Sequence, residues 1–219
     1  MSGLLVYTAS GDDELAVATC VGEWTADRLR REGHEVRHAT ELSRATLRDA
    51  LAEAEGFAAF SHGKRAALLD GDGRAVVDRH NIGLLQARWA WLHACWTAHE
   101  LAALAVDAGA TCFAGFDIPV DVGWQPHEIP FSLRATFEQL LTEVPSRLAA
   151  GVRDKAALRA AVLPLVDAVL DFAADHPDDA PPGIQTAAQQ MLHRLVIRLP
   201  AGQPPGPDGV DELLDVLIE

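Results

Sequence analysis

The stretch Gly56-Phe57-Ala58-Ala59-Phe60-Ser61-His62-Gly63 is an apolar run that ends in His-Gly. A second run of this kind, Trp89-Ala90-Trp91-Leu92-His93-Ala94-Cys95, ends in a cysteine. Short apolar runs bounded by turn residues are typical of strands buried in a sheet with helices on both faces. In open α/β sheets, ligands and chemistry gather outside the carboxyl ends of the strands. The two runs therefore predict an imidazole, His62, and a thiol, Cys95, at one edge of a sheet.

The first part of the chain alternates between strand patterns and helix patterns. Expected strands cover residues 4–9, 35–39, 57–61, 89–95 and 110–116, and expected helices cover 12–31, 45–55 and 98–107. Two apolar runs around Asp70-Gly71-Asp72-Gly73 predict a hairpin between the third and fourth of these strands. The alternation predicts an α/β fold with a mainly parallel sheet sandwiched by helices.

The second part of the chain changes character. From Pro130 onward the apolar spacing is helical, with expected helices over 133–149, 155–174 and 184–199. We therefore predict an α/β core over 1–126, followed by a helical extension over 127–199 that packs on this core. Residues 200–219 are expected to form a Pro/Gly linker and a short amphipathic tail.

Composition and sequence pattern argue against a nucleic-acid partner, a membrane span and a signal peptide. The formal net charge of −14 disfavours a nucleic-acid-binding surface, which requires clustered Lys and Arg. No apolar stretch approaches the length of a membrane span, because the best candidate, 156–174, is interrupted by charged residues and a proline. The chain opens directly into a strand pattern without a basic segment, so we expect no signal peptide. Three widely spaced cysteines do not suggest a disulfide framework, and a cytoplasmic protein is expected.

The residues around the two strand ends favour a reactive thiol. Thr97 and Glu100 have the spacing of a capping box, which predicts a helix directly behind Cys95. The positive end of such a helix lowers the pKa of a nearby thiol. His62 is followed by Gly63, which permits a close approach of the backbone. The backbone N–H groups of Gly63 and Cys95 are therefore candidates for an oxyanion hole.

Each of these residues also has a structural interpretation. Cys95 can be a small buried hydrophobic residue, and His62 a hydrogen-bonded turn residue. His93 can orient the thiolate, or it can simply fill its face of the strand. Trp96 and Trp124 can pack the sheet or line a substrate cleft.

Metal and cofactor chemistry find little support in the sequence. His93, Cys95 and His99 suggest a zinc site, but a structural zinc usually requires four ligands in tight pairs, and no C-x-x-C pair is present. No glycine-rich phosphate loop is present either. We therefore expect neither a metal nor a cofactor. The other cysteines, Cys20 and Cys112, lie in helix and strand patterns and are expected in the core.

Three motifs carry a family resemblance, and they lie over residues 60–63 (Phe-Ser-His-Gly), 91–97 (Trp-Leu-His-Ala-Cys-Trp-Thr) and 107–115 (Asp-Ala-Gly-Ala-Thr-Cys-Phe-Ala-Gly). Over about residues 4–120 the chain resembles the caspase-like superfamily of cysteine peptidases (clan CD), and it is most similar to the bacterial CHAT and caspase-like proteins. The interval from His62 to Cys95 is 95 − 62 = 33 residues, shorter than the caspase spacing of about 50. The caspase Gln-Ala-Cys-x-Gly signature is also absent, which excludes the caspases themselves and their preference for Asp.

The resemblance implies a cysteine endopeptidase with a Cys-His dyad. The Cys95 thiolate would attack the scissile carbonyl, and His62 would protonate the leaving amine and then assist hydrolysis of the acyl-enzyme. The specificity pocket would be built partly after the 110–116 strand, where Asp117 and Asp121 would select Arg or Lys. These two residues can also be ordinary loop carboxylates of an acidic protein.

The expected partner is a protein or peptide substrate, with an activating protein as an option. A catalytically idle caspase-like module that acts by binding partners is the alternative. The retention of both His62 and Cys95 counts against it, because an idle domain has no need to keep either residue. A doubly wound domain that binds a small molecule is a third hypothesis, weakened by the missing phosphate loop.

Overall fold

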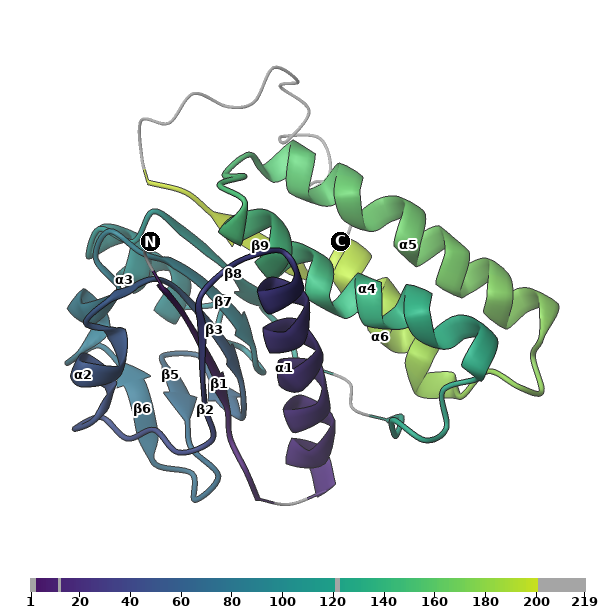
Figure 1. Ribbon diagram of the computed structural model, residues 1–219, viewed down its shortest axis with the longest axis horizontal. Helices are drawn as coiled ribbons and strands as arrows, with labels where there is room; N and C mark the ends of the chain where they lie inside the picture. Colours follow the sequence, from purple (N-terminus) through teal and green to yellow (C-terminus); the bar gives the residue numbers. More distant parts are fainter. Residues whose placement is uncertain (1–2, 12, 121–122, 201–219) are drawn as a thin grey trace.

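The computed structural model describes residues 3–11, 13–120 and 123–200, and a six-stranded sheet lies at its centre (Figure 1). The strands have the order β2-β1-β3-β7-β8-β9. Neighbouring strands from β2 to β8 are parallel, whereas β9 runs antiparallel to β8. The bounds of these strands are β1 (Gly3–Thr8), β2 (Val36–Ala39), β3 (Ala54–Phe60), β7 (Trp89–His93), β8 (Cys112–Phe116) and β9 (Leu195–Arg198).

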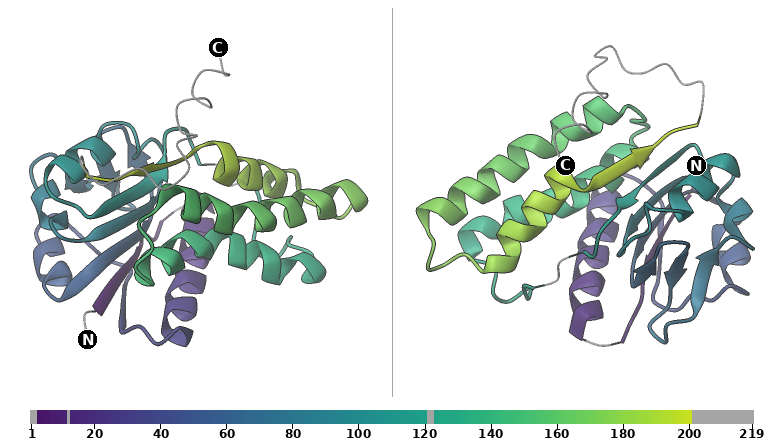
Figure 2. Two further views of the ribbon diagram at one scale, coloured as in Figure 1. Left: turned by 90° about the horizontal axis from the view of Figure 1, so that it is seen from above. Right: turned by 180° about the vertical axis from the view of Figure 1, so that it is seen from behind.

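Helices cover both faces of this sheet. Helices α2 and α3 lie on one face, and α1 and α4 lie on the other (Figure 1). Helix α5 packs against α4, and α6 packs against α5, so the second layer extends outward from the sheet (Figure 2). The predicted α/β fold, a mainly parallel sheet sandwiched by helices, is confirmed. The bounds are α1 (Asp13–Arg31), α2 (Leu47–Leu51), η1 (Ile82–Leu85), a 3₁₀ turn, α3 (Leu101–Asp107), α4 (Phe131–Ala149), α5 (Lys155–Asp175) and α6 (Pro182–His193).

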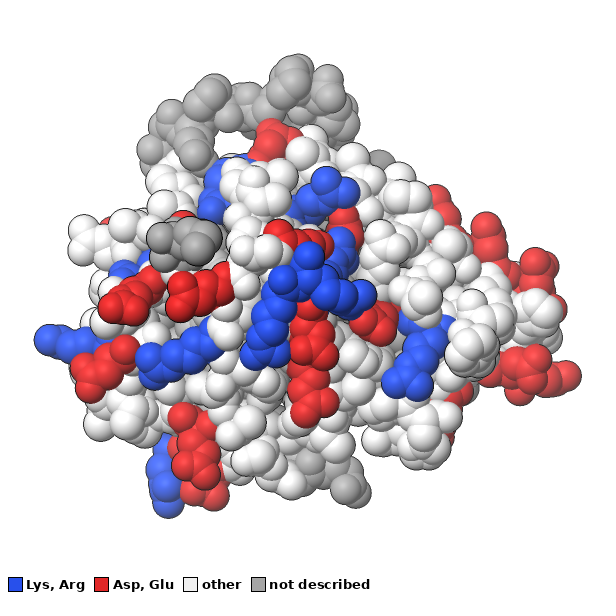
Figure 3. All heavy atoms as spheres, in the orientation of Figure 1, with Lys and Arg blue, Asp and Glu red and all other residues white. Residues whose placement is uncertain are grey.

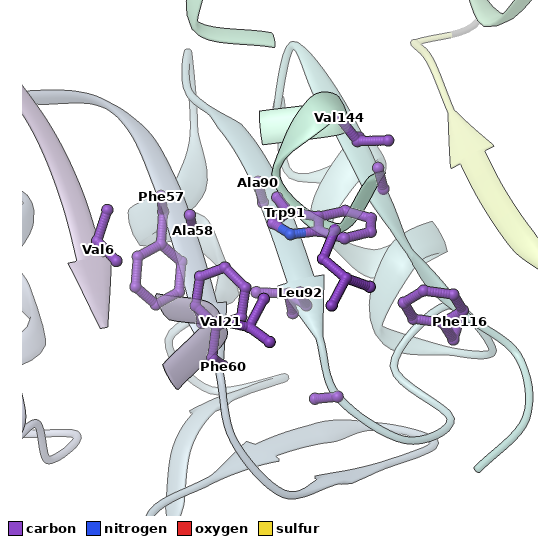
Figure 4. Packing of buried hydrophobic residues seen from close by; sticks show 14 of the residues in the cluster. Val6, Val21, Phe57, Ala58, Phe60, Ala90, Trp91, Leu92, Phe116 and Val144 are labelled. Atoms are coloured by element: carbon purple, nitrogen blue, oxygen red, sulfur yellow. The ribbon is translucent and has the colours of Figure 1, made fainter. Parts of the chain in front are cut away.

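Strands β3 and β7 form the middle of the sheet, as the two apolar runs predict. The side chains over residues 57–60 and 89–92 are at most 1% exposed. Val21 of α1 and Val144 of α4 pack over these strands (Figure 4). Burying a large apolar side chain stabilises the folded state by roughly 1.5–3 kcal/mol. This packing therefore fixes the positions of β3 and β7, and with them the edge at which both strands end.

A second sheet, antiparallel and three-stranded, follows His62. It consists of β4 (Gly63–Lys64), β5 (Ala67–Leu69) and β6 (Ala75–Asp78). The Asp70 carboxylate accepts hydrogen bonds from the backbone N–H groups two and four residues further on, at 3.0 and 2.7 Å, which fixes the turn between β5 and β6. The predicted hairpin is therefore confirmed, and β4 extends it back to the residue after His62.

Three predicted helices differ from the structure. The helix predicted over 184–199 ends at His193, and Leu195–Arg198 form β9 because the edge of β8 offers unpaired backbone groups. The helix predicted over 45–55 is limited to α2, because β3 begins at Ala54 alongside β1. The helix predicted over 98–107 begins at Leu101, with consequences for the site.

The helical extension is fastened to the core through α1 and α4. The guanidinium groups of Arg28 and Arg147 each donate to the Glu143 carboxylate at 2.7 Å. Burial by itself raises the pKa of Glu143, but the hydrogen bonds from the two arginines outweigh burial and lower it. The predicted boundary near residue 126 stays a prediction. The predicted linker and tail over 200–219 lie, beyond Pro200, outside the described residues.

The surface carries both signs of charge. Lys and Arg side chains are interspersed with Asp and Glu over the face that carries α1 and α4, and acidic side chains gather at the outer end of the helical layer (Figure 3). This face therefore has no continuous basic stripe of the kind that tracks a nucleic-acid backbone. In the part of the chain that the structure describes, no helix is both long and apolar enough to cross a membrane.

Candidate active site

The register of the sheet brings the ends of β3 and β7 to the same level. Phe60 pairs with His93 in the parallel ladder, and His62 and Cys95 each follow two residues beyond that pair. Both side chains line one small pocket at the carboxyl edge of the sheet, with a volume of about 40 Å³. The structure thus brings together the two residues predicted to react. The other lining residues are Leu15, Ala18, Ser61, His93 and Val120.

Gly63 lies where the backbone after β3 meets the backbone after β7. A Cβ atom at Gly63 would lie 2.2 Å from the carbonyl oxygen of Cys95 and 2.8 Å from Cγ2 of Thr97. Glycine is required at such a close approach because it has no side chain. The two residues predicted to donate the oxyanion hydrogen bonds, Gly63 and Cys95, are therefore neighbours, and their role stays a prediction.

The capping box predicted for Thr97 and Glu100 is wrong. The Thr97 hydroxyl donates to the carbonyl of Ala94 at 3.1 Å, and α3 begins only at Leu101 without a side-chain cap. The backbone N–H groups of Glu100 and Leu101 both donate to the carbonyl of Arg65 at 2.9 Å. Because a carbonyl from the segment between β4 and β5 takes these donors, the helix starts too late to place its positive end directly behind the thiol.

A backbone donor from another segment contacts the thiol instead. The N–H of Val120, in the segment after β8, donates to Cys95 Sγ at 3.2 Å. Such a hydrogen bond favours the thiolate, because a charged acceptor is bound more strongly than a neutral one. The sequence carries no sign of this contact, since every residue except proline supplies the same N–H.

The residue after Cys95 has a strained backbone. Trp96 has a φ of 60°, in the left-handed region that residues with a side chain rarely adopt. Its N–H donates to the carbonyl of Ile118 at 3.1 Å, and the guanidinium carbon of Arg65 lies 5.8 Å from the centre of its ring. Contacts from both sides thus hold the turn that presents Cys95, which is how strain is maintained at functional sites.

His93 lines the same pocket but belongs to the aromatic core. Its ring centre lies 5.7 Å from that of Phe60 and 5.5 Å from that of Phe116. Burial lowers the pKa of His93 to about 4. The ring is therefore neutral near pH 7, so it contributes packing beside the thiol and no positive charge.

The other residues predicted for a substrate cleft have different surroundings. Asp117 forms an ion pair with Arg194, which follows α6, at 3.2 Å, and both side chains are about one-third exposed. Asp121 lies outside the described residues. Trp124 is 2% exposed and packs edge-on against Phe137, with ring centres 4.9 Å apart, so it belongs to the core. Of the two tryptophans considered for the cleft, Trp96 is the half-buried one beside Cys95.

The remaining cysteines lie in surroundings that suppress reactivity. Cys112 is fully buried in β8, and burial raises its pKa to about 12. Cys20 of α1 is half-buried, and burial together with Glu23 raises its pKa to about 11. Both thiols are protonated near pH 7 and are poor nucleophiles. Within the described residues, no three His, Cys, Asp or Glu side chains lie close enough to hold a metal ion.

Comparison with known proteins identifies the fold class. No protein-family model matches the sequence, and no curated protein sequence matches it either. Among solved structures, the Arg-specific cysteine proteinase gingipain R is similar, with a TM-score of 0.50 and 14% sequence identity over 89% of this chain. The chain spans only 44% of that proteinase. The similarity therefore shows the fold alone: an α/β architecture that resembles that of this proteinase.

Proposed function

We propose that the protein is a cysteine peptidase in which Cys95 is the nucleophile and His62 is the general acid and base. The observation that carries the proposal is the convergence of both side chains on one pocket at the carboxyl ends of β3 and β7. The close approach of Gly63 to Cys95 and the Val120 N–H on the sulfur support it. The similarity of the fold to that of a cysteine proteinase agrees with it.

The proposed reaction has two stages. The Cys95 thiolate attacks the scissile carbonyl carbon, and the N–H groups of Gly63 and Cys95 stabilise the oxyanion that forms. The C–N bond then breaks as His62 gives a proton to the leaving amine, which leaves a thioester on Cys95. Water attacks the thioester while His62 takes one of its protons, and the acid product departs as the thiolate is restored. No third catalytic residue is required.

We infer that the residue before the scissile bond is Arg or Lys. Asp117 directly follows β8, and the segment that it begins is bonded to the Cys95 turn through the N–H of Trp96. The carboxylates of Asp117 and Asp121 would complement a basic side chain. Asp117 pairs with Arg194, and a substrate guanidinium would bind the same carboxylate beside Arg194. The similar structure, gingipain R, is Arg-specific, in agreement with this preference.

Within the caspase-like class, we propose a place among the bacterial CHAT and caspase-like proteins. The interval of 95 − 62 = 33 residues between the dyad members is too short for the caspases themselves. None of the three cysteines forms a disulfide, which agrees with a reducing cytoplasm. The partner is a protein or peptide substrate, with an activating protein as an option.

A peptide-library digest tests the proposal. The wild-type protein is expected to cut after Arg or Lys, and Cys95→Ala is expected to produce no cuts. Cys20→Ala is the matched control, because this cysteine lies on α1 and should leave the pattern unchanged. Identical products from wild type and Cys95→Ala would contradict the peptidase proposal. Cleavage after Asp would contradict only the role of Asp117 and Asp121.

One observation favours a second candidate, a caspase-like module that binds partners without cutting them. The pocket beside Cys95 has a volume of about 40 Å³, whereas ligand pockets usually reach roughly 300 Å³ or more. A partner protein captured equally by wild type and Cys95→Ala, and left uncut by both, would favour this candidate. Capture by Cys95→Ala together with cleavage by wild type would favour the peptidase.

A further inference from the structure

Residues 117–120, the segment after β8, contact the end of α6 and the residue that follows this helix. The side-chain amide of Gln190, on α6, donates to the carbonyl of Pro119 at 3.1 Å. Arg194, which follows α6 directly, pairs with Asp117 at 3.2 Å. One contact from α6 and one from the residue that follows it thus fall within residues 117–120.

A third contact lies further along the chain, at Gly123, and it agrees with an antiparallel course of residues 117–120 and α6. A Cβ atom at Gly183, near the start of α6, would lie 2.4 Å from the carbonyl group of Gly123. The three contacts follow opposite orders in the two parts of the chain, because Gly183, Gln190 and Arg194 meet Gly123, Pro119 and Asp117, respectively. The antiparallel pairing of β9 with β8 continues this arrangement into the sheet (Figure 2).

The peptide group between Pro119 and Val120 joins α6 to the nucleophile. Its carbonyl accepts from Gln190 at 3.1 Å, and its N–H donates to Cys95 Sγ at 3.2 Å. A trans peptide group is planar, with the carbonyl and the N–H pointing in opposite directions, so one hydrogen bond fixes the direction of the other. Accepting a hydrogen bond also polarises the group and strengthens its N–H as a donor.

We propose that α6 and β9 form a positioning unit for the nucleophile, in which Gln190 holds the peptide group that donates to Cys95 Sγ and Arg194 anchors the start of the same segment. This inference rests on the proposed function of Cys95. Gln190 and Arg194 are positioning residues, because they act on the thiolate through the segment Asp117–Val120. The last part of the helical extension then belongs to the active site.

The pH dependence of Cys95 alkylation by iodoacetamide, followed by mass spectrometry, tests this unit. Gln190→Ala is expected to slow alkylation of Cys95 at about pH 7 by roughly three- to tenfold and to move the profile to higher pH, because a hydrogen bond to a charged group is weakened. Gln189→Ala is the matched control, since its side chain is exposed on the same helix, and it should follow the wild-type profile.

The second anchor has its own pair of variants. Arg194→Ala should slow alkylation less than Gln190→Ala, because an ion pair that is one-third exposed is weak. Arg194→Lys should restore the wild-type rate, since a cation remains opposite Asp117. Arg198→Ala, at an exposed position of β9, should have no effect.

Val120→Pro removes the N–H that donates to Cys95 Sγ, so it tests the hydrogen bond without changing Gln190. It should slow alkylation at least as much as Gln190→Ala, and combining the two should add nothing. Cys112 is fully buried, so its protection from alkylation in each variant shows that the core of that variant is intact. A wild-type profile in Gln190→Ala would overturn the positioning role. If the profiles shift as expected while wild type cuts no peptide, the positioning role stands and the proposed function fails.

Discussion

Cys95 and Cys112 lie at opposite ends of neighbouring strands, and the same thiol group meets opposite surroundings there. Cys112 pairs with Trp89 at the amino end of the β7–β8 ladder and is fully buried, so its pKa rises to about 12. Cys95 follows the carboxyl end of β7, half-buried, and its sulfur accepts the N–H of Val120. Because both residues are cysteines, the difference in their surroundings comes from the ends of the strands at which they lie.

Replacing each cysteine in turn should give the largest difference between the two regions. Cys95→Ala should lower peptide cleavage by at least about 1,000-fold, because the acyl-enzyme can no longer form. Cys112→Ala should keep cleavage but lower the free energy of unfolding by about 1–2 kcal/mol, because a small cavity opens in β8. Cleavage assays and urea unfolding curves measure both effects. Cleavage by Cys95→Ala would contradict the role of Cys95 as the nucleophile. Loss of cleavage in a folded Cys112→Ala would contradict a purely structural role of Cys112.

A smaller but still large effect is expected at Gly63. A Cβ atom in Gly63→Ala would lie 2.2 Å from the carbonyl oxygen of Cys95, so the two backbones must move apart. Misplaced groups of this kind cost roughly 100-fold in rate, which a steady-state cleavage assay would measure. Gly83→Ala is the matched control, because a Cβ atom there meets nothing within 4 Å. Equal activity of both variants would mean that the approach of Gly63 to Cys95 has no role in catalysis.

The smallest effect concerns His93, which lines the Cys95 pocket but belongs to the core. Its native pKa is lowered from 6.5 to about 4, so between these values the unfolded chain binds a proton that the native state does not. Stability from this residue is therefore complete above about pH 6.5 and is lost as the pH falls toward 4, by about 2 kcal/mol at pH 5. Urea unfolding at about pH 7 and pH 5 should show this loss in wild type but not in His93→Phe.

The exposed His127 supplies the control for that experiment. His127→Phe should keep the wild-type difference between the two pH values, because the side chain lies on the surface. The same loss in His93→Phe as in wild type would show that other groups cause the acid sensitivity. It would also contradict the lowered pKa of His93.

Much of the fold could be predicted because it depends on local patterns. Residues 57–60 of β3 and 89–92 of β7 are continuous apolar runs, and the turn after β5 carries its Asp-Gly signature. Strand β9 could not be predicted in this way. Residues 195–198 continue the helical apolar spacing of Met191 and Leu192, and they become a strand because the edge of β8, distant in sequence, pairs with them.

In the candidate site too, the side chains could be predicted from the sequence, whereas a contact made by the backbone could not. His62, Gly63 and Cys95 could be found because their side chains, or the lack of one, mark them in the sequence. The Val120 donor could not, because it is a backbone group brought to the sulfur by α6. The capping box failed for a related reason: its local signature is sound, but the carbonyl of Arg65 accepts the N–H of Glu100 that the Thr97 hydroxyl would have accepted.

The most direct test of the dyad is the alkylation rate of Cys95 at about pH 6 to 7, compared between wild type and His62→Ala. Cys95 is expected to react faster than a free thiol in this range, and His62→Ala should slow the reaction by roughly tenfold because the proposed base beside the thiol is removed. Cys20 and Cys112 should stay slow in both proteins, since burial raises the pKa of each. A Cys95 rate equal to that of a free thiol, or unchanged in His62→Ala, would contradict the dyad.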